Sequence, residues 1–123
     1  MVQPLAIVFY ERLMPGSQLV NRLQDLHYRV LTLSNPTLLA VTARRESALL
    51  LFVDLDAPGE VCGAIEKIKA DESTHHLPII AFAPDNKLEL LAVAQKSGAN
   101  LAVSETALSG HLEQLLEQAL RLD

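Results

Sequence analysis

The sequence predicts a three-layer α/β/α sandwich built on a parallel sheet of five strands. Short aliphatic runs recur at nearly even spacing along the 123 residues, and each run is followed by a segment whose apolar residues fall at helical intervals. No two runs are joined by a tight turn of the kind that forms a hairpin. Five strand–helix units in this order predict right-handed crossovers that place helices on both faces of the sheet.

The predicted strands are the aliphatic runs at residues 5–9, 28–33, 48–53, 77–83 and 101–103. The predicted helices alternate with them and span residues 17–27, 36–45, 61–70, 84–97 and 110–122. The third strand is the strongest signal, because a continuously apolar run suits a parallel strand that is buried on both faces. The chain turns acidic directly after this run, at Asp54 and Asp56.

Capping residues indicate where the helices begin and end. Ser34 and Asn35 precede Pro36, which is typical of a helix start. Gly98 stands where a helix C-terminus favours a left-handed residue, and Ser109 is a candidate N-cap for the last helix.

Composition indicates a single domain over residues 1–123 and argues against several function classes. Ten Lys and Arg stand against fifteen Asp and Glu, so the formal charge is −5, and no basic run could neutralise a nucleic-acid backbone. No stretch approaches the roughly 18 apolar residues that a membrane span needs. The single cysteine, Cys62, excludes an internal disulfide and suits a reducing compartment, so we expect a cytoplasmic protein with no membrane or nucleic-acid partner.

In parallel α/β sheets the chemistry gathers at the carboxyl ends of the strands. The loops that begin near Tyr10, Asp54, Ala83 and Ser104 are therefore the candidate site. The simplest interpretation of Asp54 is an exposed, solvated acid at the end of a strand.

Three features in order give the chain a resemblance to the receiver domains of two-component response regulators. Asp54 ends the apolar third strand and precedes Pro58-Gly59, the fourth strand contains Leu77-Pro78-Ile79-Ile80-Ala81, and Gly98-Ala99-Asn100 leads into the fifth. The resemblance covers essentially the whole chain and implies a flavodoxin-like (βα)5 fold. It also implies that Asp54 takes the phosphoacceptor position, beside acids that bind Mg²⁺ and beside a hydroxyl and a lysine that hold the phosphoryl group.

The other positions of that site depart from the family pattern. The acidic pair at the end of the first strand falls on Tyr10 and Glu11, so one carboxylate is missing. The hydroxyl position falls on Ala83 and the lysine position on Glu105. A shift of one residue would put Ser104 in the lysine position, and neither alignment supplies a lysine.

The departures predict a degenerate receiver, or pseudo-receiver. Glu11, Asp54, Asp56 and Glu105 are expected to converge, and like charges about 4 Å apart repel by about 1 kcal/mol even at the dielectric of water. A phosphoryl group on Asp54 would add to this repulsion. We therefore expect a signalling module that works by protein–protein interaction, without normal aspartyl phosphorylation and without enzymatic activity or a cofactor.

Two alternatives remain open. Glu11 and Asp54 could bind Mg²⁺ and leave Asp54 phosphorylatable, as in a working receiver. More distantly, Asp54 and Asp56 are similar to the paired aspartates of haloacid-dehalogenase-type phosphohydrolases, which would make the protein a small metal-dependent enzyme. For partners, the resemblance implies a sensor kinase or an output protein, and a homodimer through the fourth and fifth helices.

Overall fold

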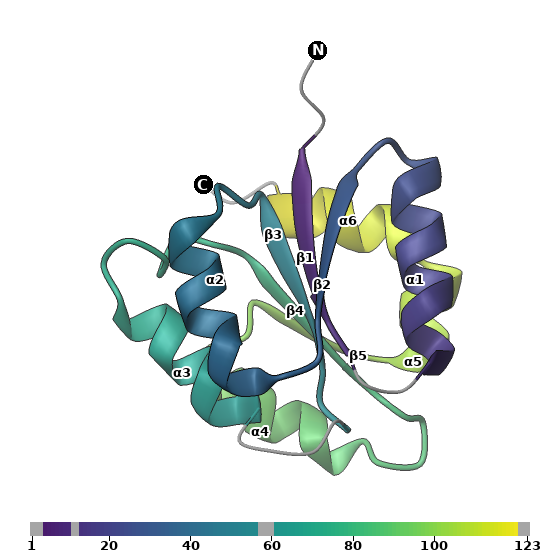
Figure 1. Ribbon diagram of the computed structural model, residues 1–123. Coiled ribbons are helices and arrows are strands. Elements are labelled where there is room, and N and C mark those ends of the chain that lie inside the picture. Colours follow the sequence, from purple (N-terminus) through teal and green to yellow (C-terminus); the bar gives the residue numbers. More distant parts are fainter. Residues whose placement is uncertain (1–3, 11–12, 57–60, 121–123) are drawn as a thin grey trace.

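The computed structural model describes residues 4–10, 13–56 and 61–120 and has the predicted three-layer architecture (Figure 1). All strands are parallel and form one sheet in the order β2-β1-β3-β4-β5. The strands are β1 (Leu5–Phe9), β2 (Arg29–Leu33), β3 (Leu50–Asp54), β4 (Ile79–Ala83) and β5 (Leu101–Ser104). The prediction of a parallel five-stranded sheet is confirmed.

Helices cover both faces of this sheet (Figure 1). One face carries α1 (Leu13–Asp25), α5 (Glu105–Gly110) and α6 (Leu112–Leu120). The other carries the short 3₁₀ helix η1 (Pro36–Leu38), α2 (Leu39–Arg45), α3 (Val61–Ala70) and α4 (Glu89–Ser97). Within the described ranges, no helix is long and apolar enough to cross a membrane.

The central strands supply two hydrophobic cores, one on each side of the sheet. Every residue of β1, β3 and β4 is buried. Leu51 and Val53 of β3 pack toward α2, α3 and α4, whereas Leu50 and Phe52 pack toward α1, α5 and α6. Because successive strand residues point to opposite faces, a strand between two helical layers must be apolar throughout. This explains the unbroken aliphatic run that made the third strand recognisable.

The structure has two helices, α5 and α6, where the sequence predicted a single helix at 110–122, and Ser109 lies inside the first of them. The hydroxyl of Ser104, the last residue of β5, accepts a hydrogen bond from the Ala107 N–H at 3.1 Å. This cap starts α5 directly after the strand, so that Ser109 lies inside the helix. The chain breaks its helical path at His111 before α6 begins at Leu112.

The fourth helix begins later than predicted, at Glu89, after turns at residues 84–88. Its C-terminus is as expected, because Gly98 adopts a left-handed conformation with φ of 119°. Asn35 is a cap, and its side-chain oxygen accepts from the Thr37 N–H at 3.0 Å, but the turn it starts is the 3₁₀ helix η1.

Helix α1 is shifted toward the N-terminus relative to the prediction and ends at Asp25. His27 follows in a left-handed conformation with φ of 71°, and the Tyr28 N–H returns to the Leu23 carbonyl at 3.0 Å. This arrangement ends the helix as a left-handed glycine usually does, but here with a residue that carries a side chain.

Lys69 forms hydrogen bonds to the segments that precede β4 and β5. Its ammonium group donates to the Leu77 carbonyl and to Asn100 Oδ1, each at 2.7 Å, and to the His75 carbonyl at 3.3 Å. Asn100 Oδ1 also accepts the Ile79 N–H at 2.9 Å. Partial burial lowers the pKa of Lys69. One lysine thus connects α3 to the start of β4 and to the segment before β5.

Candidate functional site

Asp54 is the last residue of β3 and is fully buried, with 0% of its surface exposed. The prediction of an exposed, solvated acid is therefore wrong. The reason is its position in the central strand of the sheet, where its neighbour across to β4 is Phe82. The Asp54 carboxylate accepts the Asp56 N–H at 3.0 Å, which turns the chain sharply at the end of the strand.

Asp56 forms an ion pair with Lys87, which the sequence analysis did not predict. Lys87, in the β4–α4 loop, places its ammonium nitrogen 2.7 Å from Asp56 Oδ1. The resemblance implies a lysine after the fifth strand, whereas Lys87 follows the fourth strand. The pair offsets part of the predicted charge repulsion.

The other positions that the resemblance singled out lie at the carboxyl ends of the strands. Ala83 ends β4, is fully buried and pairs with Ser104 of β5. Glu105 is the first residue of α5 and is half-buried. Tyr10 directly follows β1, and its ring lies against Gly16 of α1 so closely that a Cβ on Gly16 would overlap it. Glu11, the predicted remaining acid of the pair, lies outside the described residues.

A second polar link joins the β4–α4 loop to α5. The Asp85 carboxylate accepts the Thr106 N–H at 3.2 Å and also the Thr106 hydroxyl. These hydrogen bonds lower the pKa of Asp85. The sequence analysis placed Asp85 at the start of the fourth predicted helix and did not single out Thr106; in the structure Asp85 lies in the loop before α4.

The β4–α4 loop is thus held on both sides, by Lys87 to the turn after β3 and by Asp85 to the start of α5. The partners are 31 and 21 residues apart in the sequence. Only the order of the strands brings them together. A signal for the loop existed in hindsight, since Pro84-Asp85-Asn86-Lys87 is a polar segment that directly follows a strand of the candidate edge.

A magnesium site is not assembled by the described side chains alone. In residues 4–10, 13–56 and 61–120, no three His, Cys, Asp or Glu side chains gather in a way that could hold a metal ion. Asp54 and Asp56 carry carboxylate oxygens, which hard cations prefer as ligands; Asp54 ends β3 and Asp56 lies two residues later. A magnesium ion held by Asp54 together with Glu11 stays a prediction.

Comparison with models of protein families finds no match, and comparison with curated proteins finds none either. Solved structures do match along the whole chain. The receiver domain of a sensor histidine kinase from Pseudomonas aeruginosa, with a magnesium ion coordinated in its active site cleft, is 18% identical, with a TM-score of 0.86 over 97% of this chain and 98% of that one.

Two further structures extend this likeness. A putative response regulator from Chloroflexus aurantiacus is 14% identical, with a TM-score of 0.89 over 98% of this chain and 100% of that one. NtrX from Brucella abortus, in complex with ADP, is 16% identical, with a TM-score of 0.82 over 97% of this chain but 27% of that one. The chain therefore has the flavodoxin-like (βα)5 fold of response-regulator receiver domains.

Proposed function

We propose that this protein is a receiver-like signalling module of the two-component type that works through protein–protein contacts, without normal aspartyl phosphorylation and without enzymatic activity. The observation that carries the proposal is the β4–α4 loop, which is held on both sides by Lys87–Asp56 and Asp85–Thr106. A switch needs two conformations of comparable free energy that a modification can bias. Two polar links that hold this loop in one arrangement favour a single conformation.

The residue types around Asp54 support the same proposal. Ala83 has no hydroxyl with which to follow a phosphoryl group, and Glu105 would repel one. Burial of the Asp54 carboxylate also restricts the approach of a phosphodonor. A phosphoryl group on Asp54 would therefore form without the groups that couple it to the signalling surface.

Lys87 favours one alternative, a receiver that is still phosphorylated at Asp54 with Mg²⁺. Its ammonium group reaches Asp56, two residues beyond Asp54, and an ammonium group near an acyl phosphate stabilises its charge. One structural neighbour holds a magnesium ion in its active site cleft. In this alternative Lys87 would exchange Asp56 for the phosphoryl oxygens.

An NMR titration separates the proposal from this alternative. Backbone amide spectra would be recorded with Mg²⁺ and then with beryllofluoride, a phosphoryl mimic, for the native chain and for Asp54→Asn. We expect no saturable beryllofluoride shift at Asp54 or in the β4–α4 loop. Shifts there that disappear in Asp54→Asn and weaken in Lys87→Met would overturn the proposal and support the phosphorylatable receiver.

A second assay addresses the phosphohydrolase alternative, which rests on Asp54 and Asp56. Turnover of p-nitrophenyl phosphate would be followed with Mg²⁺ for the native chain and for Asp56→Asn. We expect no turnover above the buffer rate. Turnover that disappears in Asp56→Asn would show an enzyme.

The proposed partners are a sensor kinase or an output protein in the cytoplasm. The matching region of NtrX is about a quarter of a longer chain, which supports a module that acts with other domains. For the homodimer, Leu88 and Val93 on the α4 side expose 51% and 50% of their surfaces. Sedimentation equilibrium of the native chain and of Val93→Glu tests this: a dimer that Val93→Glu dissociates supports it, and a monomer at all concentrations contradicts it.

A further inference from the structure

The open edge of β2 presents unused backbone groups. In the described part of the chain, β2 pairs with β1 alone. The Arg29 N–H donates to the Pro4 carbonyl at 2.8 Å, and the Leu33 carbonyl accepts the Tyr10 N–H at 2.9 Å, so both residues face β1. Because successive strand residues direct their backbone groups to opposite sides, Val30 and Thr32 direct theirs to the open edge.

A groove accompanies this edge between two helices. Its volume is about 490 Å³, and it is lined by β2 residues together with Gln24 of α1 and Arg45 near the end of α2. A second hollow of about 220 Å³ lies at the other end of the strand, beside Thr32 and Leu33. Figure 1 looks onto this edge, with β2 in front of the sheet between α2 on the left and α1 on the right. An extended segment could therefore lie along β2.

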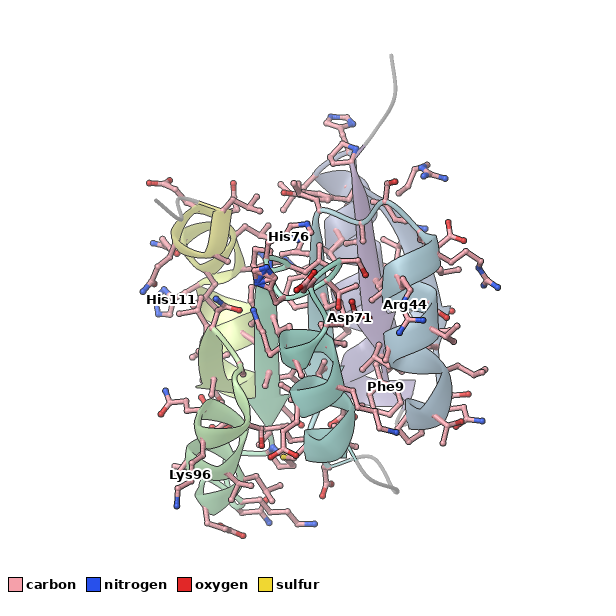
Figure 2. The ribbon with its side chains drawn as sticks, turned by 90° about the vertical axis from the view of Figure 1, so that its left-hand side faces the viewer. Phe9, Arg44, Asp71, His76, Lys96 and His111 are labelled. Atoms are coloured by element: carbon pink, nitrogen blue, oxygen red, sulfur yellow. The ribbon has the colours of Figure 1, made fainter. Side chains whose placement is uncertain are left out.

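The charge at this edge is opposite to the charge of the whole chain. The protein carries a formal charge of −5, yet Arg29 is exposed here and has no ion-pair partner among the described residues. The Arg45 side chain is 69% exposed and pairs at 3.5 Å with its neighbour Glu46, which lines the same groove. By contrast, Arg44 on the same helix donates from Nε to Asp71 Oδ2 at 2.9 Å. Figure 2 shows these two residues where α2 passes the end of α3. Two arginines and one glutamate thus lie beside the open strand, which leaves a net positive charge there with Arg29 unpaired among the described residues.

We propose that the β2 edge binds an extended acidic segment of a partner protein as a sixth strand of the sheet. The backbone groups of Val30 and Thr32 pair with the segment, while Arg29 and Arg45 bind its carboxylates. A second copy of this chain is a poorer occupant, because pairing β2 with β2 would bring the unpaired Arg29 of both copies and their net positive charge to one edge. The proposal deepens the proposed function by naming a contact surface and a partner chemistry.

The test uses a phage-displayed library of random nine-residue peptides, selected on the folded chain. We expect enriched peptides that carry Asp or Glu at alternate positions and that shift the amide signals of Val30 and Thr32. Their binding is then compared among variants. Thr32→Pro removes one outward N–H and leaves the hydrogen bonds to β1 intact, because proline is tolerated where the N–H of an edge strand faces solvent. We expect about fivefold weaker binding for the loss of this hydrogen bond.

Charge reversal gives an independent variant whose folding is not in question. Arg29→Glu changes an exposed side chain and should weaken binding of the enriched peptides about tenfold, as an attraction becomes a repulsion. Lys96→Glu makes the same change on α4, distant from β2 and pointing away from the body of the protein in Figure 2, and should leave binding unchanged. Thr32→Val keeps the N–H and should also bind normally.

Three results would overturn the inference. Peptides without an acidic preference, peptides that bind Thr32→Pro and Arg29→Glu as well as the native chain, or a concentration-dependent dimer that Thr32→Pro dissociates would each contradict it. None of these results depends on Asp54, so failure here is distinguishable from failure of the pseudo-receiver proposal, which the beryllofluoride titration decides.

Discussion

The contact between Tyr10 and Gly16 allows a prediction in which the sign of a mutational effect reverses. Tyr10 occupies a position where the family resemblance implies a carboxylate, and its ring lies over the first turns of α1. In Gly16→Ala, the added Cβ would lie 2.5 Å from Tyr10 Cε2 and closer still to Cδ2 and Cγ, whereas ordinary contact begins at 3.4 Å. The ring must therefore withdraw by more than 0.9 Å, which is the difference between 3.4 and 2.5 Å for Cε2, because Cδ2 and Cγ start closer to the added Cβ.

The magnitude follows from two opposing effects. Overpacking of this kind costs about 1–3 kcal/mol. Alanine is favoured over glycine within a helix by up to about 1 kcal/mol. We expect Gly16→Ala alone to lower the free energy of unfolding by about 1–2 kcal/mol. In a Tyr10→Ala background the overlap is gone, and Gly16→Ala should raise the free energy of unfolding by about 0.5 kcal/mol.

Urea unfolding of the native chain, both single variants and the double variant measures this coupling directly. The four free energies form a double-mutant cycle, and we expect an interaction energy of about 2 kcal/mol. Equal effects of Gly16→Ala with and without the Tyr10 ring would refute the reasoning, because the strain would then not come from that contact. Stabilisation by Gly16→Ala in the native background would refute it as well.

Three further predictions concern stability. His27→Gly should raise the free energy of unfolding by about 0.5–1 kcal/mol, because glycine adopts the left-handed conformation at φ of 71° without strain; thermal unfolding with His27→Ala as the control, which should show no gain, checks it. Lys69→Met keeps the aliphatic stem but removes the donors to Leu77 and Asn100. It should lower the free energy of unfolding, measured in urea, by about 1–3 kcal/mol. The control Lys67→Met, at an exposed lysine, should lower it by less than about 0.5 kcal/mol. Asp85→Asn should have a lower free energy of unfolding than the native chain above pH 4, and the same free energy below the lowered pKa of Asp85. Folding depresses this pKa from 3.8, so the carboxylate contributes stability that is lost as the pH falls through the folded pKa. A difference in the free energy of unfolding that persists at pH 2 would contradict this assignment.

Much of the fold could be predicted because its signals are local. The unbroken run from Leu50 to Val53 identifies a strand covered on both faces, and its burial at every residue has that physical basis. Gly98 marked the end of α4 through its own backbone freedom. The helix starts were less predictable, since Ser104 and Ser109 are chemically equivalent caps. Which serine caps the helix depends on where β5 ends.

The candidate site was predictable only in part, for a related reason. Asp54, Ala83 and Glu105 could be placed at one edge because parallel strands bring their carboxyl ends together. The burial of Asp54 was not visible, since it depends on the central place of β3 and on what covers the end of the strand. Lys87 and Thr106 were missed because their partners are distant in the sequence and belong to other loops.

The sequence by itself determined the alternation of strands and helices and the residue types that stand at each strand end, because these depend on periodicity and on position along the chain. Tertiary structure alone decided which of those residues meet. The order β2-β1-β3-β4-β5 places the β4–α4 loop between the turn after β3 and the start of α5, and it leaves β2 at an open edge beside Arg29 and Arg45. Strand order follows from the packing of segments far apart in the sequence, and no local pattern records it.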